Sequence, residues 1–264
     1  MFLQGRPSTR LVWMIAGMAL SAASSSGASP ASPPPAPAAS APFSAGQAAG
    51  ALPEGWQHIP FNKRKAPTQW RLVQDEGRTV LEASANNSVS LVMRTTSLDP
   101  KAPTIVQWRW KIDSHPAGAD NSVAGKEDSA ARLVFVFEGD KSSLPWNDRV
   151  VMRMAKTLSG QDMPYATLMY VISGVADVNT VIENPHTRRV QMIVASTARQ
   201  SLGHWVEMRR DLSADFRKAF GEAPGRLIAY GVMSDTDNTA SKARAWYGDI
   251  EINPSSEIAA GSPQ

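Results

Sequence analysis

Oxygen-bearing side chains crowd into one short segment near the end of the 264-residue chain, from Asp235 through Asp237 and Asn238 to Thr239. Carboxylate, amide and hydroxyl oxygens are the ligands that calcium prefers, and they also hydrogen-bond the hydroxyl groups of sugars. The segment is therefore a candidate ligand-binding loop, with Asp235 and Asp237 as candidate metal ligands. Calcium is the one cofactor that the sequence suggests. A purely structural turn is the alternative, because Asp and Asn also bond their own backbone.

A second candidate set follows this loop, where Tyr247 and Asp249 alternate with apolar residues and precede Glu251. On one extended strand these three side chains would share a face, with neighbouring Cα atoms about 6.8 Å apart. Glycosidases use paired carboxylates about 5–9.5 Å apart, so this spacing permits hydrolysis. Exposed strands carry such acids routinely, however. We therefore interpret Tyr247 and Asp249 as ligand-binding residues and assign no catalytic residue.

Alternating residues between Val106 and Ile112 predict a strand with two different faces. One face carries Trp108 and Trp110, which we expect to fill the core between two sheets. The other face carries Arg109 between two polar neighbours, and such a face can grip hydroxyl or carboxylate groups. Arg109 is therefore a further candidate ligand-binding residue.

A charged loop that ends at Asp128 leads into a strand that contains Arg132. The residues after Arg132 are apolar on both faces of this strand, which predicts a central, buried position. An inward-facing Arg132 would need a carboxylate from elsewhere in the chain, because an unpaired buried charge is costly. Two interpretations stay open for Asp128 and Arg132, namely a structural ion pair and recognition of a ligand.

Short alternating runs separated by turn residues must position all of these side chains. They predict ten strands, at residues 69–74, 78–84, 88–94, 104–113, 132–138, 166–173, 188–196, 204–210, 226–234 and 243–252. Two short helices are predicted at residues 149–158 and 214–220, with Asp148 as the candidate cap of the first and Ser213 or Asp211 as that of the second. The pattern predicts an all-β fold, a two-sheet β-sandwich of the jelly-roll or lectin-like type. The last two strands flank the loop at Asp235–Thr239 and should form a β-hairpin.

Composition divides the chain into four segments. Residues 1–23 combine two arginines with an apolar run too short to span a bilayer, as in a secretory signal peptide. Residues 24–51 are almost wholly Ala, Ser, Pro and Gly, which predicts a disordered tether. A single β-sandwich domain is expected over residues 52–254, before a disordered tail at 255–264. The sequence thus predicts export to the periplasm or the exterior, without stable insertion into the membrane.

Charge and cysteine content exclude several classes of protein. The chain has 27 Lys and Arg against 24 Asp and Glu, and removal of Arg6 and Arg10 with the signal would leave 25 against 24. A nearly neutral protein lacks the basic surface of a non-specific nucleic-acid binder, so no nucleic-acid partner is expected. Without cysteine, the chain has no disulfides, no thiol catalysis and no zinc–thiolate site.

Five groups of residues carry a resemblance to a known family. They are Pro67–Val73, Trp108–Trp110, Asp128–Arg132, Arg210–Leu212 with Asp215-Phe216, and Asp235–Thr239 with Trp246–Ile250. Together they resemble the uncharacterised bacterial family catalogued as domain of unknown function 3047, from about Gly55 to Asn253. The resemblance implies an exported, single-domain β-sandwich and assigns no activity. Glu127 stands where it leads us to expect an aspartate.

These features favour an exported envelope protein whose β-sandwich binds a glycan or another polar ligand without catalysis. A structural or assembly partner of another envelope protein is one alternative. A polysaccharide hydrolase or lyase is the other, and it requires acids and an arginine that converge in one cleft.

Overall fold

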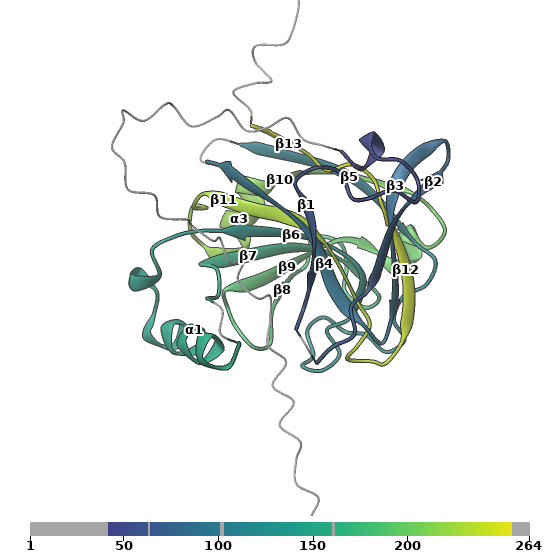
Figure 1. The fold of residues 1–264 in the computed structure, drawn as a ribbon. Helices are drawn as coiled ribbons and strands as arrows, with labels where there is room; N and C mark the ends of the chain where they lie inside the picture. Colours follow the sequence, from purple (N-terminus) through teal and green to yellow (C-terminus); the bar gives the residue numbers. More distant parts are fainter. Residues whose placement is uncertain (1–41, 63, 101–102, 160–161, 255–264) are drawn as a thin grey trace, which may run out of the picture.

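The structure is a computed structural model that describes residues 42–62, 64–100, 103–159 and 162–254 (Figure 1). The predicted signal peptide, the tether up to residue 41 and the tail from residue 255 lie outside the described residues. In the part of the chain that is described, no helix combines the length and the apolar character that crossing a membrane requires.

Two β-sheets make up the fold, and this confirms the predicted all-β, two-sheet sandwich. One sheet has seven strands in the order β1-β4-β11-β6-β7-β9-β8, and the other has the order β10-β5-β12-β3-β2 with β13 beside β5. The strands are β1 (Trp56–Pro60), β2 (Gln69–Asp75), β3 (Arg78–Asn86), β4 (Val89–Leu98), β5 (Thr104–Ile112), β6 (Ser129–Phe137), β7 (Ala166–Ser173), β8 (Val181–Glu183), β9 (Val190–Thr197), β10 (Val206–Asp211), β11 (Leu227–Asp235), β12 (Lys242–Tyr247) and β13 (Glu251–Pro254). The helices are η1 (Phe43–Ala45), η2 (Lys141–Ser143), α1 (Trp146–Ser159), α2 (Ala198–Ser201) and α3 (Leu212–Phe220).

The main core lies between the two sheets, where the alternation along β5 placed it. Trp108 and Trp110 are buried there, and the ring of Trp108 stacks on Tyr170 at a centroid distance of 5.0 Å. The prediction that both tryptophans are core residues is therefore correct. Arg109 and Lys111 point to the opposite side, so the outer face of the six-stranded sheet is polar.

Strand β6 occupies the centre of the seven-stranded sheet, as its apolar run predicted. Its inward side chains, such as Phe135, join the main core. Its outward side chains, such as Val134, join a second apolar cluster with Leu91, Met169 and Met192 on the outer face of the same sheet. The two sheets thus present outer faces of opposite character.

The predicted hairpin at the Asp235–Thr239 loop is wrong. Strand β11 belongs to the seven-stranded sheet and β12 to the six-stranded sheet, so the loop carries the chain from one sheet to the other. The predicted strand at 243–252 is also interrupted. At Gly248 the backbone lies against Arg109, where a Cβ atom would meet Arg109 Cγ at 2.6 Å, and the chain resumes as β13 at Glu251.

Local signals positioned helix α3 well and helix α1 less well. The Asp211 carboxylate accepts hydrogen bonds from the backbone N–H groups of Ser213 and Ala214, and Gly221 ends the helix with φ +72°. The Asp211 carboxylate can accept these bonds, and Gly221 tolerates the left-handed conformation because it has no Cβ atom. Helix α1 begins at Trp146, so Asp148 lies in its first turn and does not precede it. Strands β1 and β8 and helix α2 were missed because each is short.

Residues 42–50, which composition assigned to the tether, belong to the folded domain. The Phe43 ring is fully buried, 4.5 Å from the Trp56 ring, and the backbone N–H of Ala49 donates to the carbonyl of Leu72. The sequence signal was weak because Phe43 stands alone among small residues. One buried aromatic side chain and a few hydrogen bonds attach the segment to the domain.

Phe43→Ala should therefore destabilise the domain by about 3–5 kcal/mol, because the substitution empties a buried aromatic site. Urea denaturation followed by tryptophan fluorescence measures the change in the free energy of unfolding. Val175→Ala is the control, because that side chain is 65% exposed and its loss should have almost no effect. Equal free energies of unfolding for Phe43→Ala and the parent protein would show that residues 42–50 are part of the tether and not of the folded domain.

Candidate functional site

The structure separates the predicted site residues into two groups at opposite ends of β12. Asp128, Arg132 and the loop from Asp235 to Thr239 meet near the start of β12, where Asn87 N–H donates to the carbonyl of Ser241. Arg109 and Asp249 lie near its end. Each group must therefore be evaluated as a separate site.

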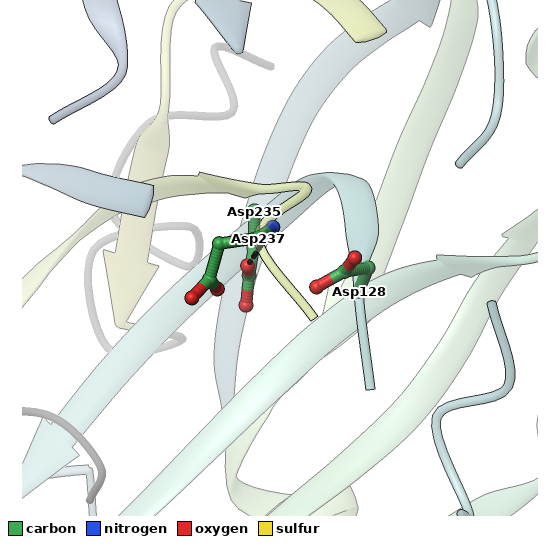
Figure 2. Close-up of side chains that lie close together, drawn as sticks. All are labelled: Asp128, Asp235 and Asp237. Atoms are coloured by element: carbon green, nitrogen blue, oxygen red, sulfur yellow. Dashed lines mark hydrogen bonds between the residues drawn. The ribbon is translucent and has the colours of Figure 1, made fainter. Parts of the chain in front are cut away.

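The first group is a buried cluster of charges, hereafter the charge cluster. Its members come from five separate segments of the chain, namely Lys65, Glu127 with Asp128, Arg132, His186, and Asp235 with Asp237. Figure 2 shows the carboxylates of Asp235 and Asp237 side by side, with Asp128 approaching from another segment. Carboxylate oxygens of these three residues lie within 4.8 Å of one another.

Asp128 holds the loop that connects the two sheets. Its Oδ1 accepts a hydrogen bond from the Asn238 N–H at 3.1 Å, and its Oδ2 accepts from the N–H and the hydroxyl of Thr239 at 2.8 and 2.6 Å. The side chain is fully buried. Three donors aimed at one carboxylate offset the cost of burying it.

Glu127 extends the charge cluster to a neighbouring loop. Its Oε2 accepts a hydrogen bond from Asn238 Nδ2 at 3.0 Å, and its Oε1 lies 2.7 Å from His186 Nε2. The resemblance led us to expect an aspartate here. Glutamate is one methylene longer, and this length lets one carboxylate reach both His186 and Asn238.

Arg132 is the buried cation of the charge cluster. Its Nη2 lies 3.5 Å from Asp235 Oδ2 and also donates to the Glu127 carbonyl, while its Nε has no hydrogen-bond partner among the described residues. Asp235 is thus the carboxylate that a buried Arg132 was expected to need. Burial raises the pKa of Asp235 well above its usual range, Arg132 opposes this rise, and Asp128 adds to it.

The charge cluster has the oxygen atoms of a calcium site but also its own cations. Lys65 contacts Asp237, and Arg132 contacts Asp235, so both candidate metal ligands are already paired. Among the carboxylate oxygens of the described residues in this cluster, only Asp237 Oδ1 is buried and lacks a hydrogen-bond partner. An ion would therefore have to displace Lys65 and tolerate a guanidinium group beside it. This arrangement favours a structural network.

Asp128→Ala should destabilise the protein by at least about 2 kcal/mol, since several donors lose a charged acceptor inside the protein. Thermal and urea unfolding measure the loss. Asp120→Ala is the matched control, because Asp120 bonds Ser122 in an exposed turn of the same loop and should matter far less. A harmless Asp128→Ala would show that the loop does not depend on this carboxylate.

Calcium should leave the melting temperature unchanged between a buffer with EDTA and one with millimolar calcium. The reason is that Lys65 and Arg132 already neutralise the carboxylates that an ion would need. Bound calcium at about 100 times its dissociation constant would add about 2.7 kcal/mol, a shift of a few degrees. A calcium-dependent rise that disappears in Asp237→Asn would contradict this prediction.

The second group lies on the outer face of the six-stranded sheet, where aromatic rings alternate with cations. The sequence of contacts is Arg109, Trp205, Lys111, Trp246 and Arg244, hereafter the tryptophan–cation ladder. Trp205 has Arg109 Cζ 4.3 Å and Lys111 Nζ 5.2 Å from its ring centroid. Trp246 has Lys111 Nζ at 5.0 Å and Arg244 Cζ at 5.2 Å. Lys111 is thus shared by both indole rings.

Two carboxylates fix the orientation of the indole rings. Trp205 Nε1 donates to Asp75 Oδ2 at 2.9 Å, and Trp246 Nε1 donates to Glu82 Oε2 at 3.1 Å. Asp75 also pairs with Lys111. Both rings are half-buried, so the ladder is a firmly held surface that still reaches solvent.

A polar hollow lies at each end of the tryptophan–cation ladder. One measures about 340 Å³, and its lining includes Arg78, Gln107, Glu207, Arg209, Asp249 and Glu251. The other measures about 490 Å³, and its lining includes Gln69, Ser84, Asn86, Asp113, Lys242 and Arg244. Amides, hydroxyls and charges of both signs are available to a ligand along the whole face.

Tyr247 and Asp249 are not placed as the sequence suggested. The Tyr247 ring is fully buried and its hydroxyl donates to the Met233 carbonyl at 2.9 Å, and burial raises the pKa of this phenol. Both oxygens of Asp249 accept hydrogen bonds from Ser44, at 2.9 and 2.6 Å. The face assignment was wrong because it assumed an uninterrupted strand through Gly248. Asp249 therefore ties residues 43–45 to the domain, and Tyr247 belongs to the core.

Sequence reasoning missed the residues that make the tryptophan–cation ladder a distinct surface. Trp246 was not among the predicted site residues, although it lies two positions after the charged Arg244 on β12 and therefore shares its outward face. Trp205 gave no signal of its own, because its partner Asp75 is 130 residues away. Lys65 and His186 were missed in the charge cluster for the same reason.

The fold and sites define a β-sandwich protein with a structural charge cluster and a polar outer sheet face. The model of the family described as protein of unknown function (DUF3047) matches residues 54–251. Because the match covers most of the chain, the chain belongs to this family. The match confirms the resemblance that the sequence motifs suggested. No curated protein matches the sequence.

Several solved structures match this chain at low similarity. The K1 cleaved adhesin domain of Lys-gingipain from Porphyromonas gingivalis W83 gives a TM-score of 0.35 at 10% identity, covering 77% of this chain and 92% of that one. The xyloglucanase domain of NopAA from Sinorhizobium fredii, in complex with cellobiose, gives 0.38 at 10% identity, covering 75% and 92%. The K3 adhesin domain of Lys-gingipain gives 0.36 at 13% identity, covering 83% and 99%.

Proposed function

We propose that this protein is exported and binds an uncharged, hydroxyl-rich glycan along the outer face of the six-stranded sheet, without catalysis. The proposal rests on one observation, the tryptophan–cation ladder with a polar hollow at each end. Indole rings contact the apolar C–H faces of sugars, while amides and charged groups bond their hydroxyls. Export is supported by the secretory character of residues 1–23.

Charge balance on this face supports an uncharged ligand. Arg71 pairs with Glu82 at 2.7 Å, and Arg244 pairs with Asp113 at 2.7 Å. Glu207 on the face offsets its strand neighbour Arg209. A face whose charges offset one another offers hydrogen bonds without a net field, so it suits neither a nucleic acid nor another polyanion.

The length of the face supports an oligosaccharide. The hollows include Val80 at one end of β3 and Ser84 at the other, about 14 Å apart along the strand. A single sugar would reach only one hollow. A linear chain of several sugars would contact both hollows and the two indole rings between them.

Binding without turnover is favoured over hydrolysis by what the structure does with the predicted acids. Asp249 is occupied by Ser44, and Tyr247 is buried, so neither is free to act on a substrate. Glu251 is exposed in the first hollow, and Glu207, which also lines it, is exposed too, whereas the general acid of a glycosidase is typically held in a shielded, apolar environment.

Trp246→Ala and Trp205→Ala should each weaken glycan binding at least tenfold, since stacking and the positions of the neighbouring cations are lost. Calorimetric titration of the parent protein with cellohexaose, xylohexaose, chitohexaose and maltohexaose identifies the ligand class, and the variants are then titrated with that sugar. Melting curves establish that each variant is folded. Trp146→Ala is the matched control, because Trp146 is an exposed tryptophan on α1 and should leave glycan binding intact.

Two results would overturn the proposal. One is a parent protein that binds none of the four oligosaccharides. The other is binding that survives both ladder substitutions, which would move the site away from this face.

A further inference from the structure

Helix α1 carries an apolar stripe that faces solvent. Trp146, Val150 and Met154 are spaced four residues apart and therefore lie on one side of the helix. Trp146 is 72% exposed and Met154 is 52% exposed, which is unusual for such large apolar side chains. Folding alone does not account for this stripe.

A basic stripe runs directly beside the apolar one. Arg149 and Arg153 are also four residues apart, and Lys156 continues the line one turn later. Among the described residues, Arg149 and Arg153 have no ion-pair partner, whereas Lys156 contacts Asp162 at 2.9 Å. The exposed side of α1 thus combines apolar anchors with unpaired positive charge.

The opposite side of α1 attaches the helix to the domain. Met152 and Ala155 are buried there with Leu144 and Met163, in the cluster that continues through Tyr165 into the main core. The acidic residue of the helix, Asp148, lies on this side, because it is four residues before Met152. Figure 1 shows α1 at the lower left, outside the two sheets. The helix is therefore held by one side and presents the other.

We propose that α1 docks this protein on the surface of an anionic lipid bilayer. Interfacial helices place tryptophan and aliphatic side chains at the level of the lipid headgroups and basic side chains against anionic ones. Trp146 and Met154 are the inserted anchors, and Arg149 and Arg153 contact the phosphate groups. The contact is shallow and reversible, so it requires no membrane-spanning segment.

An acidic protein surface is the competing occupant, and the arrangement of side chains favours lipid. A protein groove binds a helix through a wide apolar face with anchors at several turns. Here the apolar stripe is narrow, and Arg149 and Arg153 lie directly beside it. A tryptophan at one end of such a stripe is typical of a membrane interface.

Vesicle flotation tests the proposal with the mature chain, because the apolar run of the predicted signal would itself bind lipid. The vesicles contain either phosphatidylcholine alone or an equal mixture with phosphatidylglycerol. We expect binding to the mixed vesicles only, weakened by added salt. Arg149→Gln with Arg153→Gln should reduce it more than tenfold, at about fivefold per arginine. Trp146→Ala with Met154→Ser should reduce it as strongly. Arg217→Gln, on the exposed side of α3, is the matched control.

The inference fails if the mature chain does not float with the mixed vesicles, or if both double variants float as well as the Arg217→Gln control. Binding to soluble polyglutamate without binding to vesicles would assign the surface to an acidic protein and also overturn it. Trp246→Ala separates this site from the glycan site. That variant should float like the parent protein whether or not it has lost a glycan ligand.

Discussion

The fold depends on the hydrogen bonds that the buried Asp128 carboxylate accepts from the loop between β11 and β12. This loop carries the chain from one sheet to the other, and Asn238 and Thr239 are bonded to Asp128 at its turn. A buried carboxylate is expensive unless it is hydrogen-bonded, so these donors are what make its position stable. The same contacts decide where β12 begins, and therefore which of its side chains face outward.

A second carboxylate attaches the other end of β12. The backbone of Gly248 lies against Arg109, and the next residue, Asp249, accepts hydrogen bonds from Ser44. These bonds hold the segment whose Phe43 side chain is buried in the core. Asp128 and Asp249, which the sequence suggested as ligand-binding residues, thus fix the two ends of β12. Between them, β12 points Tyr247 inward and Trp246 outward, and this places Trp246 in the tryptophan–cation ladder. The scaffold and the candidate binding face are consequences of one arrangement.

Periodicity predicted most of the longer strands, but it missed the short strands β1 and β8 and did not show how the strands are assembled. Alternation along β5 correctly placed Trp108 in the core and Arg109 outside it, because each strand face has one environment. Alternation could not reveal the passage between sheets at the Asp235–Thr239 loop, since a hairpin loop and a crossing loop use the same turn residues. Alternation also assigned Tyr247 to the wrong face, because the in–out order of side chains does not continue across the break between β12 and β13. The charge cluster joins residues more than a hundred positions apart, and no local pattern reports such distances.

The two proposed surfaces lie on different layers of the molecule, so occupation of one leaves the other open. Helix α1 belongs to the connection between β6 and β7, both in the seven-stranded sheet, whereas the tryptophan–cation ladder is carried by the six-stranded sheet. The main core separates these layers, and neither surface contributes a residue to the other. A protein held at a lipid surface through α1 would therefore keep its sheet face free for a glycan. If both proposals hold, the domain would link a membrane to a polysaccharide.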